Sequence, residues 1–356
     1  MMPMVFMQSW KKGKRMILNT SAHLHHLWER GCAVLGTDYA IMGGAMSWVS
    51  ERNLVSALSN AGAFGVLACG SMPPSLLEKE IQATKALTSK PFGVNLILMH
   101  PELDALIDVC RVQSVSHIIL AGGIPKGSTI EKIKQFARVI CFAPSARIAQ
   151  KLVQMGADAL VIEGAEAGGH IGPVSTSVLA QEILPEIRDV PVFVAGGIGR
   201  GETIVSYLEM GASGVQLGTR FVCATESIAH NNFKQLFIKS SSRDAVASVQ
   251  LDPDFPVIPV RAIANKATDL FMRTQAEVIA QYRSGELDKK EAQLKIEHFW
   301  AGALRAAVVD GNIEEGSVMA GQSVGMVQRI QPTQEIIEEL LEQACQFLEQ
   351  KQHYVA

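Results

Sequence analysis

Short runs of apolar residues alternate with segments of helical period from residue 39 to residue 219. Within one of these runs, Leu160, Val161 and Ile162 follow one another with no polar position between them. Such a pattern is typical of a strand that is buried on both faces. Runs of this kind predict eight strands, over residues 39–44, 64–68, 92–96, 117–120, 139–142, 159–164, 191–197 and 214–219.

Segments of helical period separate these strands, among them 53–62, 75–87, 145–157 and 202–212. Strands that alternate with helices form parallel sheets through right-handed crossovers. Eight strands within about 180 residues are the number that closes a (β/α)8 barrel, whereas an open doubly wound sheet usually has fewer. The pattern therefore predicts an α/β fold, and specifically a (β/α)8 TIM barrel.

A repeated segment supports the barrel. Residues 155–164 (MGADALVIEG) and 210–219 (MGASGVQLGT) align position for position. Each is interpreted as the end of a helix, a tight glycine turn and then a strand, which is what repeated βα units leave in a sequence.

Beyond residue 240 the alternation stops. Residues 251–260 hold three prolines and predict an extended linker or covering segment. Helical character returns over 264–309, with a polar turn within 282–293, and a last amphipathic helix is predicted from Thr333 to Gln350. We therefore expect a smaller, mostly helical C-terminal domain. The expected parts are a poorly ordered N-terminal extension (1–27), the barrel (28–240), a linker with a helical domain that covers the substrate (241–330) and a C-terminal helix that packs back on the barrel (331–356).

Composition narrows the class of protein. Hydrophobic residues are 48% of the 356 residues and charged residues 19%, which indicates a compact globular chain. A net charge of -3 gives no electrostatic case for nucleic acid or an anionic membrane, and no apolar run approaches the ~20 residues that span a bilayer. The six cysteines contain no CxxC pair, which favours a cytoplasmic location. The apolar residues 1–7 precede the basic residues at 11–15, the reverse of a secretory signal.

His170 is the first candidate for chemistry. It follows two glycines in the stretch 161–172, where the sixth strand changes into a loop that carries two carboxylates. The loops that follow strands are where α/β enzymes keep their catalytic groups, and the near-neutral pKa of imidazole suits proton transfer. We therefore expect His170 to be catalytic.

Glycine-rich turns follow the last two strands. Gly197, Gly199 and Gly201 come after the seventh strand, and Gly218 with Thr219 after the eighth. Glycines allow backbone N–H groups to approach a phosphate closely, and barrels often bind phosphate with these two loops. The alternative, in which the glycines only permit tight turns, stays open at this point.

Two further strand ends suggest a planar ligand. The first strand ends in a Gly-Gly turn (residues 42–46), whose backbone can lie flat against an aromatic ring. Asn95 lies in an otherwise apolar strand, where burial is costly without a partner, and it offers a donor and an acceptor to a ring edge. Together with a phosphate site and a histidine, these residues predict a pocket for flavin mononucleotide (FMN).

The histidines at positions 23, 25 and 26 do not predict a metal site. His23 and His26 would share one face of a helix, but no carboxylate or cysteine joins them at close spacing. A polar surface helix is the better interpretation, and we expect no metal.

Several motifs together resemble the nitronate monooxygenase family, formerly called 2-nitropropane dioxygenase. They are MGGAMSWVS, PFGVNL, EGAEAGGHIG, VAGGIGRGE, VQLGTRF and SVMAGQSVG (317–325), and the resemblance covers about residues 28 to 350. FMN-dependent enoyl-ACP reductases belong to the same superfamily. The resemblance implies an FMN-containing (β/α)8 barrel with a smaller helical domain.

The resemblance also implies roles for particular residues. His170 matches the proposed catalytic base of the family. One position departs from the pattern, because many nitronate monooxygenases carry Gln where this chain has Glu163. An anionic Glu163 would disfavour a reduced anionic flavin unless it is protonated or paired. The implied flavin contacts are Met42, Gly43, Gly44, Asn95, Glu163, Gly168, Gly197, Gln216, Leu217, Gly218 and Thr219.

Three functions follow in order of preference. The first is a nitronate monooxygenase that oxidises alkyl nitronates with O2 to a carbonyl compound and nitrite, with His170 as base or anion stabiliser. The second is an NAD(P)H-dependent FMN enoyl-ACP reductase. The third, a barrel that binds a phosphorylated ligand without redox chemistry, needs a catalytic lysine or carboxylate pair at the strand ends. Partners would be a small-molecule substrate and O2, with no nucleic acid and no membrane. A homodimer is compatible with this reading, and the sequence does not choose between NADH and NADPH.

Overall fold

The computed structural model describes residues 22–355 apart from 71 and 256. The apolar and basic residues near the N-terminus therefore lie outside the described residues. Residues 22–35 are helical, and Leu24 and Trp28 of this helix are buried against the barrel. The expected boundary between residues 27 and 28 falls inside this helix.

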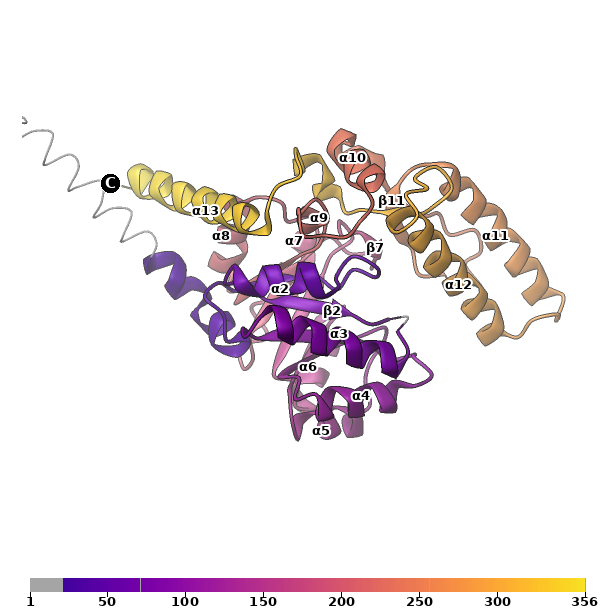
Figure 1. The fold of residues 1–356 in the computed structure, drawn as a ribbon, viewed down its shortest axis with the longest axis horizontal. Coiled ribbons are helices and arrows are strands. Elements are labelled where there is room, and N and C mark those ends of the chain that lie inside the picture. Colours follow the sequence, from indigo (N-terminus) through magenta and orange to yellow (C-terminus); the bar gives the residue numbers. More distant parts are fainter. Residues whose placement is uncertain (1–21, 71, 256, 356) are drawn as a thin grey trace, which may run out of the picture.

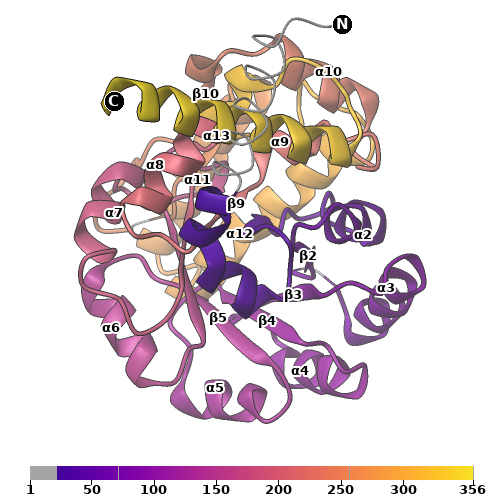
Figure 2. The ribbon, with the colours of Figure 1, turned by 90° about the vertical axis from the view of Figure 1, so that its left-hand side faces the viewer.

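Eight parallel strands form the barrel that the sequence predicts (Figure 2). Their order around the sheet is β1-β9-β8-β6-β5-β4-β3-β2. The ring closes between its first and last members, where Gly43 N donates to Phe64 O (2.8 Å) and Phe64 N to Ile41 O (2.8 Å). The strands are β1 (Ile41–Gly43), β2 (Gly65–Ala68), β3 (Phe92–Ile97), β4 (His117–Ala121), β5 (Arg138–Phe142), β6 (Ala159–Glu163), β8 (Val192–Ala195) and β9 (Gly214–Leu217).

Helices cover the outside of the barrel. In α6 the apolar side chains lie on one face, so that Ala149 and Leu152 are buried while Ser145 Oγ accepts from Ile148 N at the helix start (3.5 Å). The repeated turns contain Gly156 (φ 94°) and Gly211 (φ 104°), both in the left-handed region that favours glycine. The helices are α2 (Arg52–Asn60), α3 (Pro74–Leu87), α4 (Leu103–Val112), α5 (Gly127–Lys134), α6 (Ala146–Gln154), α7 (Thr176–Ile183), α8 (Gly201–Glu209), α9 (Thr219–Val222) and α10 (Asn231–Lys239).

A second lobe stands beside the barrel (Figure 1). It contains the helices that the sequence predicts, and also a small antiparallel sheet that it does not, because strands of two to four residues leave no periodic pattern. Phe271 and Trp300, with ring centroids 4.1 Å apart, are buried in a core of its own. The elements of this lobe are α11 (Lys266–Arg283), α12 (Lys289–Val308), β10 (Ala245–Ala247), β11 (Val260–Ile263), β12 (Val318–Met319) and β7 (Gly169–His170), with the 3-10 helix η1 (Ser242–Asp244) directly before β10.

The proline-rich segment is held against α11. Gln275, which is fully buried, accepts from Leu251 N (2.8 Å) and donates to Val249 O (3.1 Å). Asp252 forms an ion pair with Arg283 (2.6 Å). The start of the segment is therefore fixed on the lobe; its prediction was an extended linker or covering segment.

The chain ends with η2 (Gln322–Met326) and the long helix α13 (Thr333–Val355), which packs on α8 and α2. Its predicted start at Thr333 is confirmed, because Glu226 accepts from Thr333 N (3.0 Å) and Oγ1 (2.8 Å) and so caps the helix. Among the described residues, no helix has the length and hydrophobicity that would let it cross a membrane.

Candidate functional site

The polar strand ends meet at the mouth of the barrel, where the carboxyl ends of parallel strands gather. Strands β1 and β9 lie side by side, since Gly44 N donates to Leu217 O (2.8 Å). A Cβ on Gly44 would be 3.6 Å from Cγ and Nε2 of Gln216. The structure thus brings together the turn at 42–44 and the strand end at 216–219. The side chain of Met42, by contrast, belongs to the hydrophobic core.

A serine that the sequence analysis missed holds the first turn. Ser50 Oγ donates to Gly44 O (2.9 Å) and accepts from Met46 N (3.0 Å). Trp48, in the same turn, has a φ of 66°, a strained conformation for a residue other than glycine. The turn is therefore fixed by one buried hydroxyl, which no local sequence pattern identifies.

Asn95 is buried on β3, as its apolar surroundings predict. Its Nδ2 donates to Ile119 O (3.1 Å), and Cys69 Sγ donates to the backbone oxygen of Asn95 (2.8 Å). In the described chain no group donates to Asn95 Oδ1. Its donor is thus used within the protein, whereas its acceptor is available to a ring edge.

Two glycine turns after β8 and β9 have the donor set of a phosphate site. Gly196 (φ 97°) and Gly197 (φ 71°) adopt left-handed conformations. Within residues 22–355 as described, the backbone N–H groups of Gly197, Gly218 and Thr219 donate to no acceptor. Because β8 and β9 are neighbours, these donors lie at one side of the mouth. They fit the phosphate group of FMN.

The two carboxylates near the sixth strand have different environments. Glu163 is half-buried, and burial raises the pKa of its carboxyl to about 7, so that a large fraction is neutral near pH 7. No hydrogen bond to its side chain exists in the described chain. Glu166 instead accepts from Thr176 N (2.8 Å) and Oγ1 (2.9 Å) and caps α7. Glu166 therefore has a structural role, whereas Glu163 stays a candidate contact of the cofactor.

His170 belongs to the sheet of the second lobe. It pairs with Val260 of β11 in antiparallel register, and its side chain is exposed. The loop before it is fixed by Arg261, whose Nε donates to Ala165 O (2.9 Å). Gly168 packs so closely on the C-terminal segment that a Cβ would lie 2.6 Å from Gly321 N. Two distant parts of the chain therefore position His170.

Asn265 and Trp48 have structural roles. Asn265 caps α11 by accepting from Ala267 N (3.0 Å), and its Nδ2 donates to Ile313 O (2.7 Å) and Gly316 O (2.8 Å). Trp48 is half-buried below the guanidinium of Arg305 (5.8 Å) and so contacts the second lobe.

The described residues do not form a metal-binding site. His23, His25 and His26 are exposed on the N-terminal helix. No group of three histidine, cysteine or acidic side chains that could hold a metal ion occurs among the residues that the structure describes.

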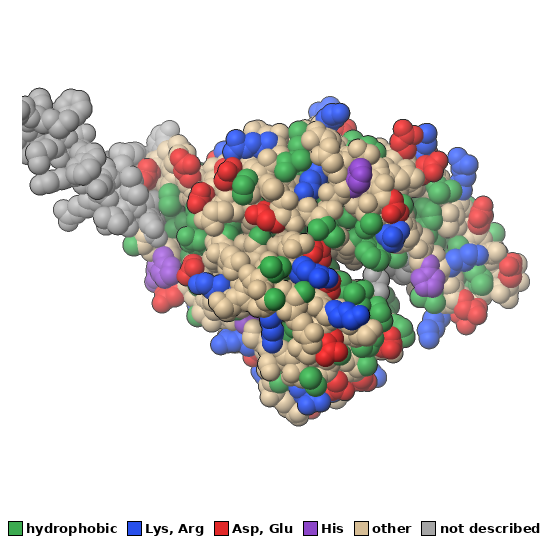
Figure 3. Space-filling model, viewed as in Figure 1, with side chains coloured by type: hydrophobic (Ala, Val, Ile, Leu, Met, Phe, Trp, Pro, Cys, Tyr) green, Lys and Arg blue, Asp and Glu red, His purple; other side chains and the backbone are tan. Residues whose placement is uncertain are grey.

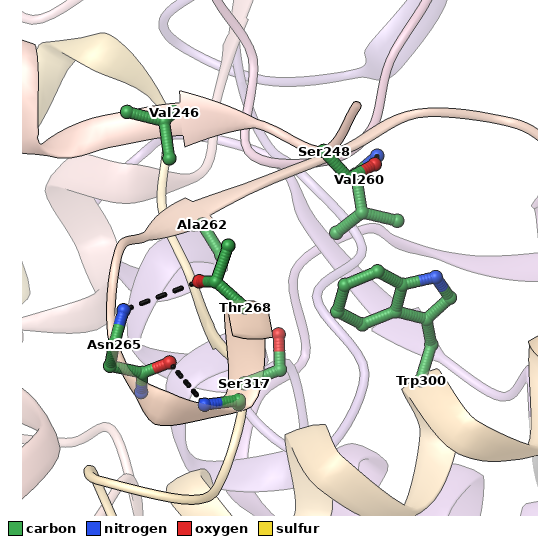
Figure 4. Close-up of a pocket in the computed structure, with 9 residues that line it drawn as sticks. Val246, Ser248, Val260, Ala262, Asn265, Thr268, Trp300 and Ser317 are labelled. Carbon is green, nitrogen blue, oxygen red and sulfur yellow. Dashed lines mark hydrogen bonds between the residues drawn. The ribbon is translucent and has the colours of Figure 1, made fainter. Parts of the chain in front are cut away.

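A small cavity lies inside the second lobe (Figure 4). Val260, Ala262, Trp300 and Ser317 are among its lining residues, and its volume of about 10 Å³ is room for one water molecule. Trp300 Nε1 and Ser317 Oγ, both buried, have no hydrogen-bond partner there. The cavity is too small for a flavin or an organic substrate.

A closed (β/α)8 barrel with a phosphate-type donor set beside β8 and β9 and polar groups around the mouth defines a cofactor-binding barrel enzyme. The chain belongs to the nitronate monooxygenase family, whose model matches residues 29–113 and 103–343. It is therefore an oxidoreductase of a flavin-dependent family, which sets aside a barrel without redox chemistry.

Three similar proteins cover most of the chain. A (3aS,4S,5R,7aS)-5-hydroxy-7a-methyl-1-oxo-octahydro-1H-indene-4-carboxyl-CoA dehydrogenase of Rhodococcus jostii is 30% identical, over 87% of this chain and 94% of its own. A nitronate monooxygenase of Paraburkholderia phytofirmans is 27% identical, over 90% and 96%. The structure of FabK from Thermotoga maritima has a TM-score of 0.80 and 33% identity, and covers 91% of this chain and 98% of its own.

Proposed function

We propose that this protein is an FMN-dependent oxidoreductase that reduces an α,β-unsaturated acyl thioester, with NAD(P)H as the electron donor. The observation that carries the proposal is the similarity to a carboxyl-CoA dehydrogenase of Rhodococcus jostii, which is 30% identical over 87% of this chain. Figure 3 shows hydrophobic side chains on the barrel and on the lobe of α11 and α12, on either side of the notch between them.

The loops at the mouth carry unusually exposed apolar side chains. Met99 follows β3 and is 66% exposed, and Ile124 follows β4 and is 48% exposed. Ile258, two residues before the strand that pairs with His170, is 51% exposed. Exposed apolar side chains on loops that follow barrel strands favour an apolar ligand at this end of the barrel.

The comparisons support the same substrate class. The Rhodococcus relative, the first of those described above, is a carboxyl-CoA dehydrogenase, so its substrate is a thioester of coenzyme A. That relative is 30% identical to this chain, whereas the Paraburkholderia nitronate monooxygenase is 27% identical.

The residues of the site then take distinct roles. Gly197, Gly218 and Thr219 would bind the FMN phosphate, and Asn95 Oδ1 would accept from the ring edge. When bound, FMN would supply the hydride chemistry, by which a hydride of NAD(P)H would reach the β-carbon of the thioester. His170 would donate the proton that the α-carbon receives, because a positioned imidazole can act as a general acid. Neutral Glu163 would avoid repulsion of negative charge at the ring.

Anaerobic mixing tests this proposal. The purified yellow protein is mixed with NADH or NADPH and the visible flavin absorbance is followed, and a 2-enoyl thioester is then added. We expect bleaching by one nucleotide and return of the colour with the thioester. Bleaching by neither nucleotide would contradict the reductase proposal.

Nitronate oxidation is the second candidate, supported by the family model and by the Paraburkholderia relative. In this reaction His170 would hold the anionic nitronate or remove a proton from the neutral nitroalkane, and O2 would be the oxidant. Flavin reduction by an alkyl nitronate, without any response to nicotinamides, would establish this function in place of the first.

We further propose a cytoplasmic location. All six cysteines are free, and five of them are buried, as is usual for proteins of a reducing compartment. Loss of activity on expression in an oxidising compartment, with new disulfides detected by mass spectrometry, would agree with this location. Full activity there with no change in the thiols would remove its support.

A further inference from the structure

The two phosphate turns are linked through the C-terminal helix. The turn after β8 leads into Gly201, the first residue of α8, and the turn after β9 leads into Arg220. Both of these residues contact side chains from α13, a helix more than 100 positions later in the chain.

The first contact is made by an amide. Gly201 N donates to Gln343 Oε1 (2.9 Å). Helix α13 reaches this residue directly, because a Cβ on Gly201 would collide with the backbone at Leu340 and Ala344. Gly201 thus allows close approach, and Gln343 satisfies a backbone donor at the start of α8.

The second contact is an ion pair. The side chain of Arg220 is 5% exposed, and its Nη2 lies 3.1 Å from Glu339 Oε1. Its Nη1 donates to Met326 O (2.8 Å). The same segment, residues 321–326, contacts Thr219, because Gly321 N donates to Thr219 Oγ1 (3.0 Å). A buried guanidinium therefore holds the second turn from behind.

These contacts join into one network. Gln343 Nε2 donates to Glu339 Oε1 (3.2 Å), so that a continuous path of polar contacts runs from Gly201 through Gln343 and Glu339 to Arg220. Burial alone would raise the pKa of the Glu339 carboxyl, but the hydrogen bond from Gln331 and the charge of Arg220 outweigh it and lower the pKa. Glu339 is thus anionic at neutral pH and attracts Arg220.

We propose that Gln343 and Glu339 are positioning residues for the cofactor phosphate, because they fix the spacing of the two turns that bind it. Neither residue lies on the turns themselves, and the sequence analysis assigned α13 only to packing. The inference rests on the proposed binding of FMN at this site. The network should affect binding of the phosphate and not of the ring. The proposed ring contacts, Asn95 on β3 and Gly44 after β1, lie outside the network.

The test compares two ligands that differ by the phosphate. Apoprotein of the full chain is titrated with FMN and with riboflavin, and binding is measured from the quenching of flavin fluorescence. Gln343→Ala and Glu339→Ala are compared with Gln346→Ala, an exposed residue of the same helix whose amide bonds only Glu342 among described residues. Circular dichroism checks that each variant is folded.

We expect Kd for FMN to rise about fivefold in each of the two network variants, the effect of one lost hydrogen bond. Kd for riboflavin should be unchanged, and Gln346→Ala should behave as wild type. The double variant should lose little more than either single variant, because both residues act through one network.

Two results would overturn the inference, and they differ from each other. Equal losses for FMN and riboflavin, or none for either, would show that α13 does not act on the phosphate turns. If wild-type protein does not bind FMN more tightly than riboflavin, the assignment of the phosphate site itself fails, and this inference with it.

Discussion

The barrel and the second lobe contribute to the site in different ways. The residues assigned to the cofactor lie at the ends of barrel strands. The barrel has a continuous core of buried side chains, which extends from β1 to α13. His170 instead pairs with β11 of the lobe, which has a separate core around Phe271 and Trp300. The half-buried Met319 contacts both cores. The cofactor would therefore have a rigid site, whereas His170, the proposed proton donor, lies where two bodies meet.

Function makes different demands on the barrel site and on the lobe. A hydride must be transferred over a short distance, which requires a rigid ring site. A substrate that binds between the barrel and the lobe would require a cover that adapts to it. Changes in the lobe should therefore affect turnover and substrate binding, while changes at the barrel mouth should affect the cofactor.

The largest effect is expected for His170→Ala. Loss of a positioned general acid should lower kcat/KM about 10²–10⁴-fold, while the flavin content stays constant because the proposed phosphate and ring sites lie on the barrel. Steady-state kinetics and the visible spectrum measure the two quantities. His298→Ala, an exposed histidine on α12, is the control. Nearly normal turnover of His170→Ala would refute its catalytic role.

Phe271→Ala should make the lobe unfold at a lower temperature than the barrel. Its ring is fully buried against Trp300, so its removal should cost about 3–5 kcal/mol. We expect a new, earlier transition in calorimetry and a higher KM, with flavin still bound. The neighbouring Leu270→Ala is the control, because Leu270 is 46% exposed. Release of flavin at the same early transition would show that the two bodies unfold as one.

Arg261→Met tests the connection between the lobe and the loop that leads to His170. The substitution keeps an apolar stem but removes the bonds to Ala165 O and Ala245 O (2.6 Å), at a cost of about 2 kcal/mol. Hydrogen exchange in residues 164–170 should become faster, and kcat should fall less than in His170→Ala. Arg273→Met changes an exposed arginine of α11 and should leave exchange unchanged. Unchanged exchange in Arg261→Met would contradict this role.

Glu163→Gln should have the smallest effect, and it should depend on pH. The carboxyl has an ordinary pKa of 4.5 when unfolded and about 7 when folded. The neutral form therefore stabilises the fold fully below pH 4.5, and this contribution is lost as the pH rises to about 7. Between these values wild-type apoprotein should lose on the order of 2 kcal/mol relative to the variant.

Urea unfolding at several pH values measures this difference. Glu186→Gln removes an exposed carboxylate of the same barrel and should give a pH profile parallel to that of wild type. A difference between wild type and Glu163→Gln that does not vary with pH would rule out the buried, neutral carboxyl.

The sequence by itself determined the barrel. Eight apolar runs, the left-handed turns at Gly156 and Gly211, and the start of the last helix at Thr333 are local features, and the structure confirms them. Periodicity records how each element is buried, so it can be seen without knowledge of the partner. The glycine turns after β8 and β9 were identified in the same way.

Only the tertiary structure decided how the site is supported. The pairing of β7 with β11, the bond from Arg261 to Ala165 and the network from Gly201 to Arg220 each join residues far apart in the chain. Two-residue strands and single side-chain bonds leave no period in a sequence. Their partners are chosen by the packing of the lobe and of α13 on the barrel, which is set when the whole chain folds.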